Sequence, residues 1–124
     1  SFVVLIARLR ALARRGGASR QAILAVADLE LDPGSRSCTR ADELIELTPR
    51  EHALLEVLMR ADGDVVSKKD LVDHVWGLDF DGDHNVVEVY IGYLRKKIDQ
   101  PHSQKLLQTV RGFGYRIAGD GPGR

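Results

Sequence analysis

The segment 84–98, HNVVEVYIGYLRKKI, predicts an amphipathic helix whose large side chains fall on two different faces. One face has apolar side chains at spacings of four, three and four residues, the pattern of a buried seam: Val87, Ile91, Leu94 and Ile98. The second face, also at helical spacing, carries Val86, Val89, Tyr90 and Tyr93 and is followed by Lys96 and Lys97. Because one buried face is enough to hold a helix on a domain, the second face predicts a contact with something else.

The net charge of the 124-residue chain is zero, but its charges are unevenly distributed. Residues 62–83 hold seven acidic and two basic side chains, a net charge of −5. Residues 84–116 hold six basic and two acidic side chains, a net charge of +4. The two-faced helix therefore lies in a basic segment that follows an acidic one. Adjacent segments of opposite sign favour a polyanionic partner on one side of the fold only.

Composition and motifs exclude several classes of protein. With 44% hydrophobic and 29% charged residues, the chain has the composition of a globular domain with its own core. The single cysteine, Cys38, excludes an internal disulfide and a cysteine zinc cage and favours a reducing cytosol. No apolar run approaches the ~20 residues of a membrane span. The four histidines are scattered along the chain, and the sequence contains no nucleophile motif, no phosphate-binding loop and no pair of residues at the spacing of metal ligands. We therefore expect a cytoplasmic protein that is not an enzyme, binds no metal or cofactor and contacts no membrane.

The N-terminal part of the segment 22–118 predicts short strands. The turn-forming clusters DPGS and RADE divide residues 22–47 into three or four antiparallel strands. The candidate strands are residues 23–26, 29–31, 36–39 and 44–47.

Two further helices and a hairpin are predicted around the segment 84–98. In TPRE, Thr48 and Glu51 form a capping box and Pro49 occupies the first position of a helix that continues to about Ala61. Ser67 caps a second helix, which Gly77 ends and whose inner face carries Leu71, Val72, Val75 and Trp76. The glycines of RGFG predict a turn between strands at 106–110 and 115–117. Three helices followed by a hairpin predict an α+β winged helix-turn-helix fold.

A winged helix explains the second face of the helix 84–98. Such a helix can enter the major groove of DNA, while the hairpin reaches the minor groove or the backbone. The residues Val86, Val89, Tyr90 and Tyr93 would then face base edges, and the cations of the helix would neutralise phosphates: Arg95, Lys96 and Lys97. The alternative is that the second face packs against another protein, in a winged-helix interaction module without DNA affinity.

The motifs DLELD, LTPRE, ALLEVL, DGDVVSKKDLVDHVWG, NVVEVYIGYLRKKID and TVRGFGYRI follow one another over residues 22–118. In order and spacing they resemble the effector domain of OmpR/PhoB-type response regulators of bacterial two-component systems. The resemblance implies an N-terminal antiparallel four-stranded sheet, a three-helix core and a C-terminal hairpin wing. It also implies sequence-specific binding of promoter DNA, with the recognition helix 84–98 in the major groove and the wing 106–117 on the minor groove or backbone.

Carried over position by position, the resemblance assigns roles to individual residues. It places five residues of the recognition helix toward the groove: Asn85, Val86, Val89, Tyr90 and Tyr93. Arg95 and Lys97 fall at the end of the helix that contacts the backbone, and Thr109 and Arg111 fall at DNA-contacting positions of the wing. Gly92 and Tyr93 stand where relatives often have arginine or another polar residue.

The resemblance also implies a larger protein and further partners. Residues 1–15 resemble the last helix of a receiver domain, 16–21 a linker and 119–124 a flexible tail. The missing receiver would be phosphorylated in a phosphorelay from a sensor histidine kinase, and a homodimer would bind direct-repeat half-sites.

The acidic loop 77–83 corresponds to the family segment implied to contact RNA polymerase, and its candidate contacts are Asp79, Asp81 and Asp83. Their spacing mimics a calcium loop, but His84 replaces the required glycine and Tyr90 the bidentate glutamate, so we exclude calcium.

Overall fold

The structure is a computed structural model that describes residues 23–119. The expected receiver remnant at 1–15 and the expected linker at 16–21 lie outside the described residues, as does nearly all of the expected tail. Within the described residues the chain forms two compact units, and the boundary between them falls between Glu46 and Leu47.

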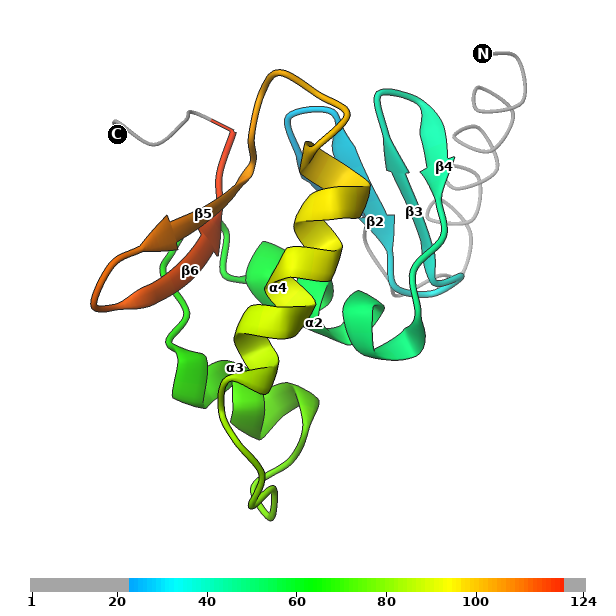
Figure 1. Ribbon diagram of the computed structural model, residues 1–124. Helices are drawn as coiled ribbons and strands as arrows, with labels where there is room; N and C mark the ends of the chain where they lie inside the picture. The colour runs from blue at the N-terminus through cyan, green and yellow to red at the C-terminus, as the bar shows by residue number, and fades with distance from the viewer. Residues whose placement is uncertain (1–22, 120–124) are drawn as a thin grey trace. The chain divides into compact units, whose positions relative to one another are not determined.

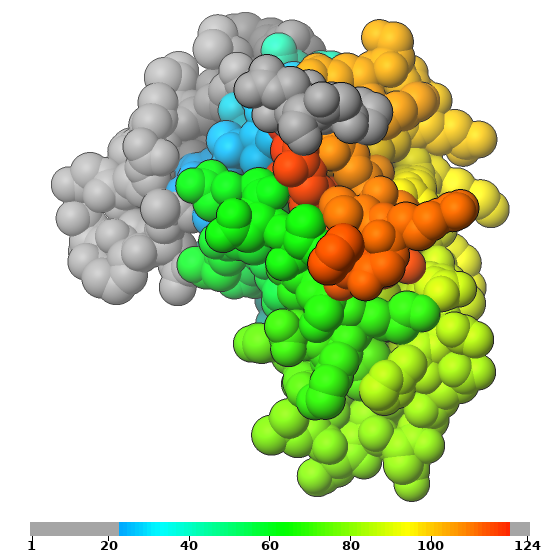
Figure 2. Space-filling view, turned by 90° about the vertical axis from the view of Figure 1, so that its left-hand side faces the viewer, coloured from blue at the N-terminus to red at the C-terminus, as the bar shows by residue number. Residues whose placement is uncertain are grey.

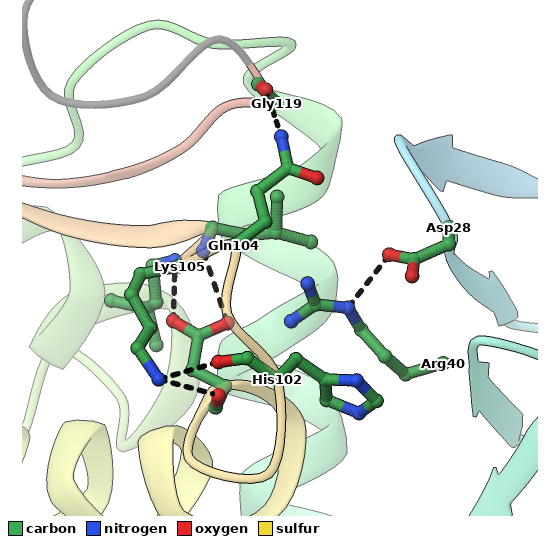
Figure 3. A network of polar contacts seen from close by, with 9 residues as sticks. Asp28, Arg40, His102, Gln104, Lys105 and Gly119 are labelled. Atoms are coloured by element: carbon green, nitrogen blue, oxygen red, sulfur yellow. Dashed lines mark hydrogen bonds and ion pairs between the residues drawn. The ribbon is translucent and has the colours of Figure 1, made fainter.

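The N-terminal unit is an antiparallel sheet of four short strands in sequential order. These strands are β1 (Leu24–Val26), β2 (Leu29–Asp32), β3 (Ser37–Arg40) and β4 (Glu43–Ile45). Between β3 and β4, Ala41 and Asp42 have φ values of 53° and 68°, and a two-residue hairpin turn of type I′ requires positive φ at both positions. Arg40 is buried, and its Nε donates to Asp28 Oδ1 at 2.7 Å (Figure 3). The predicted four-stranded sheet is confirmed with small shifts of the strand ends.

The C-terminal unit contains three helices and a two-stranded hairpin (Figure 1). Its elements are α2 (Pro49–Arg60), α3 (Lys68–Val75), α4 (Val86–Leu94), the π-helical turn η1 (Arg95–Asp99), β5 (Leu107–Val110) and β6 (Gly114–Ile117). Helix α4 packs on α2 and α3, and β6 packs on α2. The predicted order of three helices and a hairpin is confirmed.

Helix α2 begins with the predicted capping box. The amide of Glu51 donates to Thr48 Oγ1 at 3.2 Å, and the amide of Thr48 donates to Glu51 Oε1 at 3.0 Å. The two hydrogen bonds satisfy amides that have no partner within the helix. The side chains of Leu54, Leu55 and Leu58 on the inner face are fully buried, as the sequence predicts.

Replacing Thr48 by alanine should lower the free energy of unfolding by about 1 kcal/mol, because the Glu51 amide loses its acceptor. Urea denaturation followed by circular dichroism measures this change. Thr48→Ser keeps the hydroxyl and is the matched control, with an expected change well below that of alanine. Equal stability of the alanine and serine variants would contradict a role for the hydroxyl.

The recognition helix differs from its predicted bounds at both ends. It begins at Val86 and not at His84, because Asp83 Oδ1 accepts from the amide of Asn85 at 2.9 Å and holds these residues in a turn. At its other end the helix continues into η1, where the amide of Gln100 donates to the carbonyl oxygen of Arg95 at 2.8 Å. This spacing of five residues is that of a π-helix, which the apolar periodicity did not predict.

The hairpin is attached to the segment between α2 and α3. Val66 and Tyr115 exchange two backbone hydrogen bonds, at 2.8 and 3.0 Å, so that Val66 forms a one-residue bridge beside β6. The bridge fixes the base of the hairpin and leaves its tip, residues 111–113, exposed.

Candidate nucleic-acid interface

The inner face of the recognition helix is buried as predicted. Val87, Leu94 and Ile98 have no exposed surface and Ile91 retains 1%. Burial of four such side chains fixes the rotation of α4 about its axis, because the other face must then point outward.

The outer face of α4 is accessible to a partner. Val89 is 48% exposed and Tyr93 is 45% exposed, while Val86 and Tyr90 are half-buried. Asn85, directly before the helix, is exposed. The five predicted groove-facing residues therefore occur along one accessible side of the helix and its N-terminal turn.

A row of aromatic side chains supports this outer face. The ring of Tyr90 makes edge contacts with Trp76 at 5.3 Å and with Tyr93 at 5.2 Å between centroids. Trp76 in turn lies beneath the guanidinium of Arg50, whose Cζ is 5.1 Å from the ring centroid. Edge-to-face contacts at these distances restrict the rings, so Tyr93 is held by its neighbours.

Trp76 differs from its predicted place on the inner face of the second helix. Its side chain is only half-buried and contacts Tyr90. The spacing of three residues between Tyr90 and Tyr93 was a signal for their contact, whereas the contacts of Arg50 and Trp76 depend on tertiary packing.

The three cations at the end of the recognition helix have different surroundings. Arg95 Nη2 donates to Thr109 Oγ1 at 2.6 Å, which joins the helix to the hairpin. Lys96 is exposed. Lys97 Nζ is 2.6 Å from Glu51 Oε1, so part of its charge is neutralised within the fold.

The ion pair between Lys97 and Glu51 perturbs the carboxyl group. Burial by itself raises the pKa of Glu51, but hydrogen bonds from Lys97 and Thr48 and the charge of Lys97 together outweigh burial and place the pKa below its usual value. Glu51 therefore stays ionised and keeps Lys97 close to the start of α2.

The turn of the hairpin exposes the predicted contact residue Arg111 and also Phe113, which was not among the predicted contact residues. Arg111 is exposed in the turn, and Phe113 in the same turn is 73% exposed. Figure 2 shows the orange surface of the hairpin between the green segment of α2 and α3 and the yellow recognition helix. A groove of about 330 Å³ runs beside the hairpin and includes Lys68, Glu88 and Thr109 in its wall. The hairpin thus has the geometry of a wing next to a recognition helix.

The acidic loop lies at the opposite end of α4 from the cations. Asp79 and Asp81 are exposed, and so is Leu78 between the end of α3 and these carboxylates. Asp83 is used locally, since it accepts from the amide of Asn85. The separation of charge along the helix agrees with the pattern in the sequence.

Residues 23–119 contain no group of three or more histidine, cysteine, aspartate or glutamate side chains placed to hold a metal ion. They also contain no helix with the length and apolar character that crossing a bilayer requires.

The exposed helix, the wing and the three-helix core define a winged helix-turn-helix domain. The family model described as the C-terminal domain of transcriptional regulatory proteins matches residues 42–117. The chain belongs to this family and is of the OmpR/PhoB type.

Similar proteins agree with this assignment. The chain is 45% identical over 114 residues to the transcriptional activator protein IrlR of Burkholderia pseudomallei, covering 92% of this chain and 50% of that protein. It thus spans about half the length of the curated relatives it matches.

Two solved structures have the same fold. The DNA-binding domain of CpxR from E. coli has a TM-score of 0.69 at 28% identity, covering 81% of this chain and 99% of that one. The RstA DNA-binding domain of Klebsiella pneumoniae, in complex with the RstA box, has a TM-score of 0.68 at 25% identity, covering 82% and 99%.

Proposed function

We propose that the chain binds promoter DNA in a sequence-specific manner and is the output domain of a response regulator. The observation that carries this proposal is the accessible outer face of α4 beside a projecting wing, with cations in η1 directly after α4 and on the wing. A helix of this kind fits the major groove, and a wing beside it can reach the neighbouring minor groove or backbone. The RstA domain, a structure of the same fold, was determined in complex with a DNA site.

We propose that the DNA-contacting residues predicted from the sequence form the interface and that Lys97 has a smaller part in it. Asn85, Val86, Val89, Tyr90 and Tyr93 face the bases. Arg95, Lys96, Thr109 and Arg111 contact the backbone, and Lys97 contributes less because it is paired with Glu51.

The salt dependence of binding tests the proposal. Neutralisation of about four phosphates predicts a slope of roughly −3 to −4 in log affinity against log salt. Fluorescence anisotropy with a labelled mixed-sequence duplex, at several salt concentrations, measures the slope of the 124-residue chain. The alternative function, a protein-interaction module, is favoured by the exposed apolar atoms of Val89 and Tyr93. A chain that binds no duplex, or binds with a nearly flat slope, supports that alternative and overturns the DNA proposal.

Arg111→Ala should weaken DNA binding by about 1 kcal/mol or more and reduce the salt slope by about 1, because one phosphate contact is lost. The loss should be similar for all duplex sequences if Arg111 contacts phosphate. Arg60→Ala is the matched control, since Arg60 is an exposed arginine at the end of α2 that pairs with Glu56. An Arg111→Ala variant with the affinity of the unchanged chain removes the wing from the proposed interface.

We also propose the partners that belong to a complete response regulator. A receiver domain preceding this chain would accept a phosphoryl group from a sensor histidine kinase, and two copies would bind direct-repeat half-sites as a homodimer. The acidic loop would contact RNA polymerase. Electrostatics supports this orientation, because aspartates placed against phosphates would be repelled.

The double variant Asp79→Ala/Asp81→Ala should retain DNA affinity and lower transcription. Both carboxylates are exposed and lie at the end of α4 away from Arg95 and Lys96. Anisotropy measures the affinity, and transcription in vitro with the full-length regulator and RNA polymerase measures the output. Glu43→Ala removes an exposed carboxylate elsewhere and is the control. Unchanged transcription of the double variant would eliminate the loop as a polymerase contact.

A further inference from the structure

The exposed face of α4 lacks the arginine or lysine that most often reads guanine. Within α4, all of which the structure describes, Glu88 is the only charged residue, and its Oε2 is 2.7 Å from Lys68 Nζ. Guanine is read most often by arginine or lysine donating to its O6 and N7 atoms. The first cation of the recognition helix is Arg95, which lies beyond α4 and donates to Thr109. The middle of the helix therefore has no cationic donor for a guanine.

The same face does carry groups that match thymine. Val89 and Tyr93 expose apolar atoms, and Val86 is partly accessible one turn before Val89. The C5-methyl group of thymine is the apolar feature that the major groove presents, and aliphatic or aromatic side chains contact it. The edge contact with Tyr90 holds the Tyr93 ring in place, so that less side-chain freedom is lost when the ring meets a base.

Asn85 adds a group that matches adenine. Its backbone amide donates to Asp83 Oδ1 at 2.9 Å. Its side-chain Nδ2 is 3.5 Å from Asp83 Oδ2, at the limit of a hydrogen bond. An exposed asparagine amide can pair with N6 and N7 of adenine. Adenine and thymine form one base pair, so Asn85 and the apolar side chains of this face match the same kind of DNA site, one that contains A·T pairs.

The cations near this face favour DNA over a protein as its binding partner. Lys96 is exposed at one end of the helix, and Arg111 is exposed on the adjacent wing. Cations at one end of an apolar strip and on the wing beside it complement a duplex, in which phosphates border the base edges of the groove.

From these observations we infer that the recognition helix reads A·T base pairs, through apolar contact of Val89 and Tyr93 with thymine methyl groups and through Asn85 with adenine. The inference rests on the proposed function and adds the class of base pair that the site selects. Guanine, where the half-site contains it, is read outside the positions that α4 covers.

Removal of single methyl groups tests the inference. Repeated selection from a random duplex pool with the 124-residue chain supplies a bound site. Each thymine of that site is then replaced by uracil, which removes only the C5-methyl group. We expect about three- to fivefold weaker binding at two or three neighbouring positions, the effect of losing one buried methyl group at each, and no change at thymines outside the site.

Val89→Ala supplies the matched protein variant, since Val89 is exposed and its loss leaves the core intact. The variant should bind the thymine duplex about three- to fivefold more weakly and should lose the preference for thymine over uracil at one position. Tyr93→Ala should lose this preference at a neighbouring position. Arg60→Ala should keep the preference throughout.

The failure of this inference is distinguishable from failure of the proposed function. Specific, salt-dependent binding in which every uracil substitution leaves affinity within twofold would overturn the inference and leave the proposed function standing. Strong weakening by 7-deazaguanine at positions between the uracil-sensitive ones would overturn it as well, because α4 would then read guanine. Absence of binding to every duplex would overturn both.

Discussion

Gly114→Ala is expected to lower the free energy of unfolding by about 3 kcal/mol or more and to weaken DNA binding by displacing the wing. Gly114 has a φ of 152°, and a Cβ atom at this position would lie 2.1 Å from the carbonyl oxygen of Val66. That oxygen accepts from the amide of Tyr115 at 3.0 Å, so the clash would fall on the bridge that anchors the hairpin. The chain must then either open the bridge or shift β6 away from α2.

Gly92→Ala is the matched control for this substitution. Apart from its chain neighbours and the backbone of its own helix, no atom lies within 4 Å of a Cβ built on Gly92, which lies inside α4. Alanine in the interior of a helix is favoured over glycine, so this variant should be more stable by about 0.5–1 kcal/mol. Urea denaturation measures both variants. Similar stability changes in the two would show that the contact with Val66 does not limit position 114.

The elements of the fold could be predicted because each is encoded by local patterns. The capping box of Thr48 and Glu51 depends on residues three apart, and both hydrogen bonds occur. The seam that includes Val87 and Ile91 depends on helical periodicity, and both side chains are buried. Local patterns of this kind do not require knowledge of tertiary distances.

The candidate site could be predicted in its location but only partly in its contacts. The exposure of Val89 and Tyr93 follows from the rotation of a helix whose other face is buried. Lys97 has the same local pattern as Lys96, yet only Lys97 lies within 2.6 Å of Glu51, which is 46 positions away in the chain. Pairings between distant segments leave no periodic signal, so the sequence could not distinguish these two lysines.

The junction between the recognition helix and the wing was also missed by local patterns. In η1 the hydrogen-bond spacing changes, and Arg95 donates to Thr109 across the junction. Lys105 Nζ donates to the carbonyl oxygens of Asp99 and His102, at 3.1 and 2.6 Å, which satisfies acceptors at the end of the helix (Figure 3). Gln104 in the same loop donates to the carbonyl oxygen of Gly119. The spacing between helix and wing is therefore set by a loop with its own polar network.

Asp99 is the central residue of that network. Asp99 is 3% exposed, and its two carboxylate oxygens accept from the amides of Leu106 and Leu107 at 3.0 and 2.9 Å. Both leucines are buried, so these amides cannot turn to water instead. One carboxylate thus joins the last turn of the recognition helix to the first residues of the wing.

Asp99→Ala should lower the free energy of unfolding by about 3 kcal/mol, because two buried amides lose their acceptors at about 1–3 kcal/mol each. Asp99→Asn keeps the shape of the side chain but offers only one acceptor oxygen to the two amides. This variant should therefore lose about half as much free energy of unfolding as the alanine variant. Urea denaturation measures both, and Asp73→Ala, which removes a carboxylate paired with Lys69 at the surface, should change stability by less than about 1 kcal/mol.

The same variants test whether the network matters for binding as well as for stability. At temperatures where Asp99→Asn remains folded, a displaced wing should weaken DNA binding and reduce the contribution of Arg111, so that Arg111→Ala costs less affinity in this background than in the unchanged chain. Equal costs of Arg111→Ala in both backgrounds would mean that the wing keeps its position without the carboxylate. A loss that depends on the background would instead make Asp99 a positioning residue, because its buried carboxylate would act through the placement of the wing.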